Sequence, residues 1–149
     1  MSTEIQNILD KEKMSLSSIN KRANAFFIDE MLLSFLLVVS LWDSFSSVST
    51  LEEVVAITNK FILEYMFIKI IYQAFFVMKY GASLGKIVMK IRVIEIRTLQ
   101  NPSVISSLNR AIFRIISESF FYLGFLWGFF DKFKQTLHDK TAKTIVIDV

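Results

Sequence analysis

The sequence predicts an all-α membrane protein with two full transmembrane helices, a broken third hydrophobic helical segment and a short cytoplasmic β-ribbon. The 149 residues are 53% hydrophobic and only 21% charged, against about 45–50% and about 25% in a soluble domain. The excess apolar residues are gathered into long blocks, and two short β-branched runs lie outside them. We expect a loosely ordered polar tail over 1–20, without a cleaved signal peptide, and one membrane domain over 21–149.

The first apolar block runs from Ala23 to Trp42 and predicts a transmembrane helix over about 21–42. Twenty helical residues span about 30 Å, which is the thickness of the hydrocarbon core of a bilayer. Asp29 and Glu30 interrupt the block in its first half, and Trp42 closes it as an interfacial anchor.

The second apolar block, Phe61 to Met78, predicts a transmembrane helix over about 58–80. It carries Glu64 and Lys69 inside the apolar run. Polar and aromatic side chains recur at helical spacing and place one wetter face on this helix. These side chains are Tyr65, Lys69, Tyr72, Gln73 and Phe76.

The segment 103–135 has two interpretations, because its most apolar part covers only residues 120–130. A helix over Ile112 to Phe130 gives a third crossing of the membrane. A bend around 117–124 gives instead a helical hairpin that enters the membrane and returns.

The distribution of basic residues favours the hairpin. Short loops rich in Lys and Arg mark the cytoplasmic side of a membrane. Lys21 and Arg22 precede the first helix, the loop 43–59 is acidic, and the stretch 79–97 is basic. This pattern places both termini in the cytoplasm, whereas a third crossing would move the four lysines within 132–143 to the outside.

Two short runs, Lys90–Ile96 and Lys143–Asp148, have the alternation and β-branching typical of strands. A strand in a helical membrane protein has unpaired edges unless it finds a second strand. We therefore expect the two runs to form an antiparallel ribbon at the cytoplasmic surface.

Charged side chains inside the predicted membrane helices are the candidate functional residues. A charge near the bilayer centre costs at least about 2.5–3.5 kcal/mol, so it is normally paired or faces a cavity. Asp29 and Lys69 lie at similar depths on adjacent helices, which predicts that they pair. Arg114 and Glu118 are one helical turn apart and are also predicted to pair.

We consider Asp29, Glu64 and Glu118 as candidates for binding a proton or a small cation, with Asp29 as the functional centre. The structural alternative is that these carboxylates only hold the helices together. Asp139 has a predicted structural role at the cytoplasmic surface. Its candidate partners are Arg22, Arg110 and Arg114.

Nothing in the sequence points to an enzyme. The chain has no cysteine, and its single histidine, His138, offers neither a multi-histidine metal site nor a nucleophile–base pair. The motif GASLGK at 81–86 lacks the spacing and the Lys-Ser/Thr end of a phosphate-binding loop, so we interpret it as a turn. We expect no cofactor, no metal and no nucleic-acid partner; the partner is the lipid bilayer.

Three motifs resemble signatures of the RDD family of small bacterial integral membrane proteins. RANAFFID, from Arg22 to Asp29, resembles the start of that family's first membrane helix. GASLGKIVMKIRVIEI resembles its Leu-Gly-Lys segment with the following Arg-Val. LWGFFDKFKQTLHDKTAKTIVI is similar to its closing QTLHD pattern, which supplies Asp139. The resemblance runs from about residue 20 to 147.

Other positions extend the resemblance. Asn109, Arg110 and Arg114 stand where the family places polar and basic residues, while Lys143 replaces a usually small residue. The resemblance implies a bacterial inner-membrane protein, and for some members a role in exchange of monovalent cations and protons.

Two classes of function therefore remain open. The first is a subunit of a small-cation or proton transporter, which requires a homo-oligomer or a larger membrane complex because two crossings cannot enclose a pathway. The second is a non-transporting membrane scaffold or assembly factor.

Overall fold

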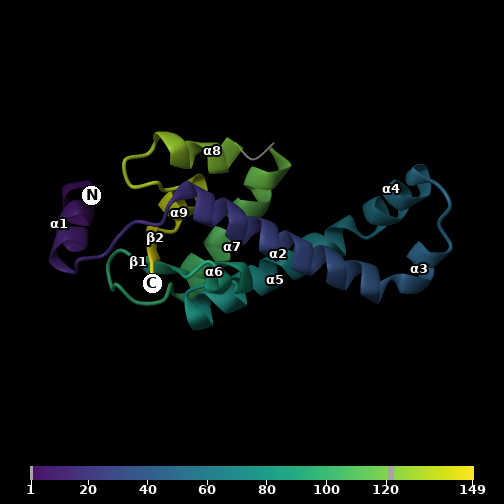
Figure 1. Cartoon of the computed structure of the whole chain (residues 1–149), viewed down its shortest axis with the longest axis horizontal. Helices are drawn as coiled ribbons and strands as arrows, with labels where there is room; N and C mark the ends of the chain where they lie inside the picture. Colours follow the sequence, from purple (N-terminus) through teal and green to yellow (C-terminus); the bar gives the residue numbers. More distant parts are fainter. Residues whose placement is uncertain (1, 121–122) are drawn as a thin grey trace.

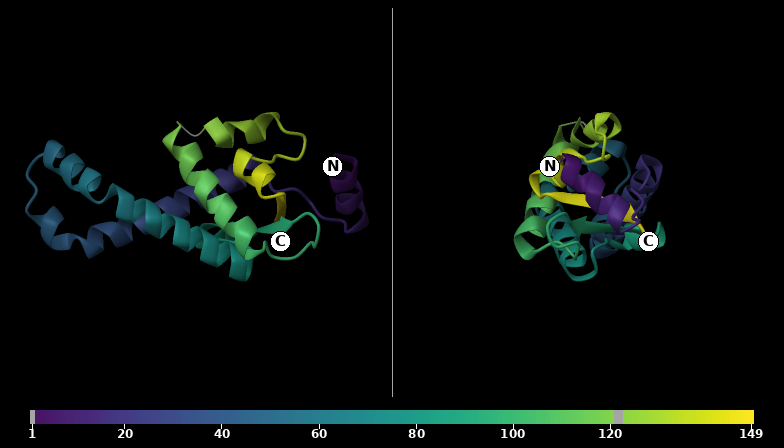
Figure 2. Two further views of the ribbon diagram at one scale, coloured as in Figure 1. Left: turned by 180° about the vertical axis from the view of Figure 1, so that it is seen from behind. Right: turned by 90° about the vertical axis from the view of Figure 1, so that its left-hand side faces the viewer.

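The computed structural model describes residues 2–120 and 123–149, and it is mostly helical with one small sheet. The elements in chain order are α1 (Ser2–Lys11), α2 (Ile19–Ser40), α3 (Trp42–Ser46), α4 (Leu51–Lys60), α5 (Ile62–Tyr80), α6 (Leu84–Val88), β1 (Ile91–Glu95), α7 (Val104–Ser119), α8 (Leu123–Phe130), α9 (Leu137–Thr141) and β2 (Thr144–Asp148). The long helices α2 and α5 extend along the molecule, with α3 and α4 at one end (Figure 1). The sheet, α1 and the C-terminus gather at the other end, which we call the ribbon end (Figure 2).

The first predicted membrane helix is confirmed as α2. Ser18 caps its N-terminus, where the Ser18 hydroxyl oxygen accepts a hydrogen bond from the Lys21 N–H at 3.2 Å. Its 22 residues span about 33 Å. Among the described residues, α2 is the one helix that is long and apolar enough by itself to cross a membrane. Phe27, Met31 and Phe35 are exposed on it, as expected for a helix surrounded by lipid.

The second predicted membrane helix forms with a break that the sequence analysis did not anticipate. α5 begins at Ile62 and is bent by 60° from α4, and the two together have the length and composition of a span. The acidic segment 43–59 is not a simple loop, because α3 and most of α4 lie in it. α4 begins at a capping box between Thr50 and Glu53, a sequence pattern that favours a helix start.

The third hydrophobic segment is broken, as predicted. α7 and α8 are bent by 104° from each other. Of the predicted break at 117–124, residues 121–122 lie outside the described residues. Glycine is required at Gly124, because a Cβ there would lie 2.0 Å from the hydroxyl oxygen of Ser117. This close approach folds α8 back against α7.

Both ends of this segment lie at the ribbon end. The Ser103 N–H donates a hydrogen bond to Glu95 at the end of β1, at 3.1 Å. The Gln135 side chain donates to the carbonyl oxygen of Thr144 in β2, at 2.9 Å. The segment therefore leaves the ribbon and returns to it, which is the geometry expected of the hairpin, and a single straight helix over 112–130 does not form.

The predicted ribbon is confirmed. β1 and β2 pair antiparallel, with Ile91 opposite Asp148 and Glu95 opposite Thr144. Along the other edge of β2, the Ser17 N–H donates to the Val146 carbonyl oxygen at 3.0 Å. β2 is thus flanked on both sides, which satisfies backbone groups that an isolated two-stranded ribbon leaves open.

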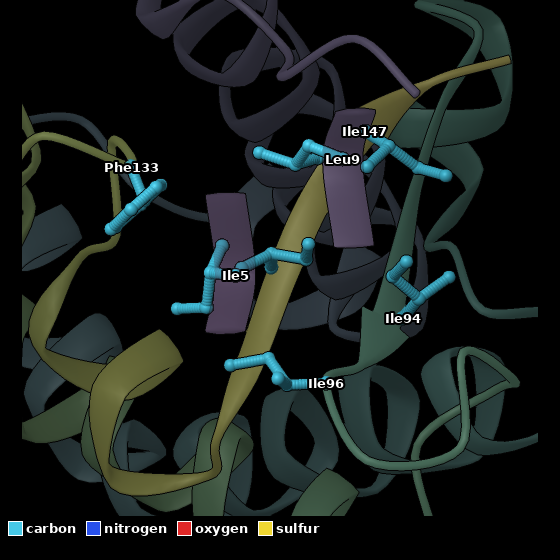
Figure 3. Packing of buried hydrophobic residues seen from close by; sticks show 7 residues of the cluster. Ile5, Leu9, Ile94, Ile96, Phe133 and Ile147 are labelled. Carbon is cyan, nitrogen blue, oxygen red and sulfur yellow. The ribbon is translucent and has the colours of Figure 1, made fainter. Parts of the chain in front are cut away.

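The two faces of the ribbon bury different sets of side chains, because successive residues of a strand point to opposite faces. One face packs against α2 and α5 through Ala25, Val77, Ile91, Val93 and Val146. The other face packs against α1 (Figure 3), through a cluster of Ile5, Leu9, Ile94, Ile96, Phe133, Ile145 and Ile147. The N-terminal segment is therefore not a loose tail, since α1 covers one face of the ribbon.

Candidate functional site

Asp29 lies at the centre of a group of buried polar side chains. It is fully buried in the middle of α2. The Tyr72 hydroxyl and the Gly85 N–H each donate a hydrogen bond to its Oδ1 at 2.8 Å. Ser83 and Gln73 donate to Oδ2 at 2.6 and 3.2 Å. Because an ionised carboxylate only accepts hydrogen bonds, these four donors match Asp29 in its charged form.

The close packing of α6 against α2 brings these donors to Asp29. Ser83 is the N-cap residue of α6, and Gly85 follows in its first turn. A Cβ at Gly85 would lie 2.0 Å from the carbonyl oxygen of Ala25, so glycine is required there. The segment 81–86, predicted as a turn, therefore forms one wall around Asp29.

A network of charged side chains adjoins Asp29. Lys69 on α5 forms ion pairs with Glu30 at 2.9 Å and with Glu118. Arg114 on α7 pairs with Glu118 at 3.1 Å and with Glu30 at 3.5 Å. The Arg114 Nη1 lies 3.9 Å from Asp29 Oδ2. We call these five residues the deep cluster, and it contains three carboxylates and two cations.

The predicted pair between Asp29 and Lys69 is wrong, whereas the pair between Arg114 and Glu118 is confirmed. The sequence matched Asp29 and Lys69 by depth, but depth does not determine which side of α2 faces the lysine. Glu30 is rotated by about 100° from Asp29, and it faces Lys69 while α6 covers Asp29. The sequence analysis assigned no role to Glu30, although its place in an apolar block was a usable signal.

A second group, the Asp139 cluster, lies at the ribbon end and consists of Arg22, Arg110, Thr136 and Asp139. The fully buried Asp139 carboxylate forms ion pairs with Arg22 of α2 and Arg110 of α7. Thr136 adds hydrogen bonds from its N–H at 3.0 Å and its hydroxyl at 2.7 Å. Of the three predicted arginine partners, Arg22 and Arg110 are confirmed and Arg114 belongs to the deep cluster.

Asp139 and the adjacent His138 titrate far from their usual ranges. Burial raises the pKa of the Asp139 carboxyl, but Arg22 and Arg110 outweigh burial and hold this pKa well below its usual value. Burial lowers the pKa of His138 well below its usual value. The His138 imidazole is therefore neutral at neutral pH.

The hydrogen bonds of Thr136 determine which nitrogen of His138 carries the proton. Thr136 donates its hydroxyl hydrogen to Asp139, so it accepts a hydrogen bond from His138 Nε2, which lies at 3.0 Å. His138 Nδ1 consequently carries a lone pair. This nitrogen is buried without a hydrogen-bond partner among the described residues.

A cavity of about 120 Å³ lies between the deep cluster and the Asp139 cluster. Elements α2, α6, α7, α8 and α9 contribute to its wall, and we call it the central cavity. Its polar lining consists of Arg22, Asp29, Lys86, Arg114, Thr136 and His138. Phe26, Phe125 and Phe129 supply much of its apolar lining.

Lys86 is the cation in this cavity that the sequence analysis missed. It is only 9% exposed, and within the described ranges it has neither an ion pair nor a hydrogen bond. Burial, followed by repulsion from Arg110 and Arg114, lowers the pKa of Lys86 to about 7. The available signal was the Leu-Gly-Lys segment that also carries the family resemblance.

Glu64, the third predicted ion-binding candidate, lies away from both clusters. It is exposed on α5 and lines, with Tyr65 and Leu33, a groove of about 370 Å³ between α2 and α5. Across residues 2–120 and 123–149, no group of three or more His, Cys, Asp or Glu side chains is arranged to hold a metal ion.

Comparison with known proteins places this arrangement in a family. The model of the RDD family matches residues 16–143, a range that contains both clusters and the central cavity. No curated protein and no solved structure matches the chain significantly. By length and composition, the helices within residues 2–120 and 123–149 provide one to three candidate membrane spans. Because the family model covers most of the 149 residues, the chain belongs to the RDD family and is a membrane protein.

Proposed function

We propose that the chain is a subunit of a bacterial inner-membrane assembly that exchanges a small monovalent cation for a proton. The observation that supports this most is the charge of the deep cluster, where the ion pairs that Asp29, Glu30 and Glu118 form among the described residues are only with Lys69 and Arg114, while burial lowers the pKa of the nearby Lys86 to about 7. One carboxylate in this cluster has no cation to balance it. An uncompensated charge is expensive inside a membrane, so the carboxylate takes either a proton or a cation.

Glu30 is the carboxylate best suited to this exchange. Its side chain is 24% exposed, against 11% for Glu118 and 1% for Asp29. Glu30 lies about 16 Å along α2 from Ile19, close to the middle of a helix of about 33 Å. Asp29 is already bound by four donors, so its proposed role is to anchor α6.

The exchange follows from charge balance. When Glu30 is protonated, Asp29 and Glu118 balance Lys69 and Arg114, and the deep cluster is neutral. When the proton leaves, the cluster gains one negative charge and attracts a monovalent cation. Proton and cation thus compete for one position, which is the requirement for exchange.

The orientation and assembly are part of the same proposal. The positive-inside rule favours a cytoplasmic ribbon end, because basic residues gather there in the last turn of α5, in β1 and in the turns beside β1: Lys79, Lys90, Arg92 and Arg97. The acidic α3–α4 end is then outside. Two long helices and a returning hairpin do not enclose a pathway, so we propose a homo-oligomer or a larger membrane complex.

The test is cation-dependent proton flux in vesicles that contain only the purified protein. An imposed gradient of Na⁺, K⁺ or Li⁺ should change the internal pH, which a trapped dye reports. Glu30→Gln should abolish this change, whereas Glu52→Gln, which removes an exposed acid from α4, should keep it. Full flux in a normally inserted Glu30→Gln protein would contradict the role of Glu30.

A non-transporting scaffold is the second candidate, and a specific observation favours it. Asp29 and Asp139 are each bound by at least four donors, as structural carboxylates are. Complete absence of flux from the parent protein with all three cations would favour this candidate over exchange by the chain alone.

A further inference from the structure

We propose that the central cavity binds a phosphate group, with the Lys86 ammonium as its main ligand. Three cations line this cavity from three elements: Arg22 from α2, Lys86 from α6 and Arg114 from α7. Asp29 is the one acid among its described lining residues, and four donors cover its two oxygens. Arg22 and Arg110 share the single carboxylate of Asp139, so the Asp139 side of the cavity has a surplus positive charge, which favours an anion there.

Lys86 is a buried cation in the cavity wall that has neither an ion-pair nor a hydrogen-bond partner among the described residues. Buried polar groups are normally hydrogen-bonded, so a buried ammonium group without a partner in the wall of a cavity points to a ligand. A phosphate oxygen accepts a hydrogen bond from Lys86.

The size and the chemistry of the cavity favour a polyatomic oxyanion. Its volume of about 120 Å³ is far above the roughly 10–15 Å³ that one water requires. Arg114 Nη1 lies 3.9 Å from Asp29 Oδ2, beyond a normal hydrogen bond, so it can donate to a ligand. Guanidinium and ammonium groups together are the usual ligands of phosphate in proteins.

The surroundings of the cavity suit a phosphate carried by a lipid. Arg22 lies about 5 Å along α2 from its start, near the depth of lipid headgroups. Phe129 of α8 lines the cavity and is exposed, and Trp127 and Phe130 of the same helix are exposed beside it. The acyl chains of a lipid can pack on this apolar surface while its phosphate group reaches Lys86. A free phosphate ion offers the same oxygens to Lys86, so the experiment has to distinguish the two sources.

The experiment measures binding to the full-length protein in neutral, lipid-free detergent by calorimetry. The probes are inorganic phosphate and a short-chain phosphatidylglycerol. Lys86→Met should weaken binding about tenfold or more, because it removes a charge-assisted hydrogen bond. Lys79→Met, which removes an exposed lysine at the same end, should change affinity by less than about twofold. Binding of phosphatidylglycerol alone identifies a headgroup site, and binding of inorganic phosphate identifies a free-phosphate site.

The pH dependence gives an independent readout. Arg22, Asp29, Arg110, Arg114, His138 and Asp139 are the charged or titratable groups around Lys86. Affinity for phosphatidylglycerol, whose charge is constant between pH 6 and 8, should fall over that range as Lys86 loses its proton. Lys86→Arg should flatten this slope, because guanidinium stays charged.

Three results would overturn the proposal. The first is that the parent protein binds neither probe. The second is equal loss of affinity in Lys86→Met and Lys79→Met, which indicates non-specific attraction to surface charge. The third is an unchanged pH slope in Lys86→Arg.

Discussion

Arg22 in the first turn of α2 and Asp139 in α9 form a buried ion pair although 117 residues separate them in the sequence. Arg110 of α7 binds the other oxygen of the same carboxylate. Three distant parts of the chain therefore converge on one side chain, which fixes the start of the first membrane helix to the C-terminal segment.

Asp139→Asn should destabilise the protein by about 3–5 kcal/mol, because it leaves two buried arginines without their shared counter-charge. Thermal unfolding in detergent measures the effect. Asp10→Asn, which removes an exposed carboxylate of α1, should leave the midpoint nearly unchanged. Equal midpoints for Asp139→Asn and the parent would refute the structural role of this ion pair.

Stability should fall as the pH drops below about 6.5. The unfolded chain binds a proton on His138 near its usual pKa of 6.5, whereas burial lowers the pKa of His138 in the folded protein. The unfolded state therefore binds more protons and is favoured in acid. Below about 3.8, protonation of Asp139 in the unfolded state adds to the loss. His138→Gln should remove the fall between about pH 6.5 and 5, and an unchanged profile in this variant would assign the loss to other groups.

Asp29→Asn should lower the free energy of unfolding by about 1–3 kcal/mol. In this variant an amide NH₂ group replaces one carboxylate oxygen, so donors of the site face another donor instead of an acceptor. Exchange activity per folded molecule should persist in this variant and be absent in Glu30→Gln. Unfolding midpoints and vesicle flux measured on both variants separate the two roles. A stable Asp29→Asn protein without exchange would instead support the sequence-based prediction that Asp29 carries the ion.

Single cysteines in this cysteine-free chain should report its topology in intact cells. Ser47→Cys, at the α3–α4 end, should react with an impermeant thiol reagent from outside. Val149→Cys, exposed beside the end of β2, should react only after the cells are opened. Labelling of both positions from outside would mean an odd number of crossings and would refute the hairpin topology.

Regular patterns made much of the fold predictable from the sequence. The length of the block at 23–42 predicted α2, and alternation at 90–96 and 143–148 predicted the two strands and their pairing. The packing of α1 was not predictable in this way. Ile5 and Leu9 become core residues only because the ribbon presents Ile94 and Ile147 to them.

The candidate site was predictable in its charges but not in its pairing. Lys69 and Asp29 do lie at comparable depth, yet α2 is rotated so that Glu30 faces Lys69 while α6 covers Asp29. Glu30 therefore forms the ion pair with Lys69. The sequence places Lys86 in a predicted turn. Its burial depends on the cavity wall built by α2, α7, α8 and α9, which no local pattern reveals.

The late position of α9 and β2 relative to α2 and β1 has a consequence for biosynthesis. Arg22 emerges from the ribosome 117 residues before Asp139, which corresponds to roughly 6–23 seconds of synthesis. During that interval α2 and α5 can insert, while the partners of Arg22 and β1 have not been made. The charge of Arg22 and the open edge of β1 therefore stay unpaired at the membrane surface until Asp139 and β2 have been made.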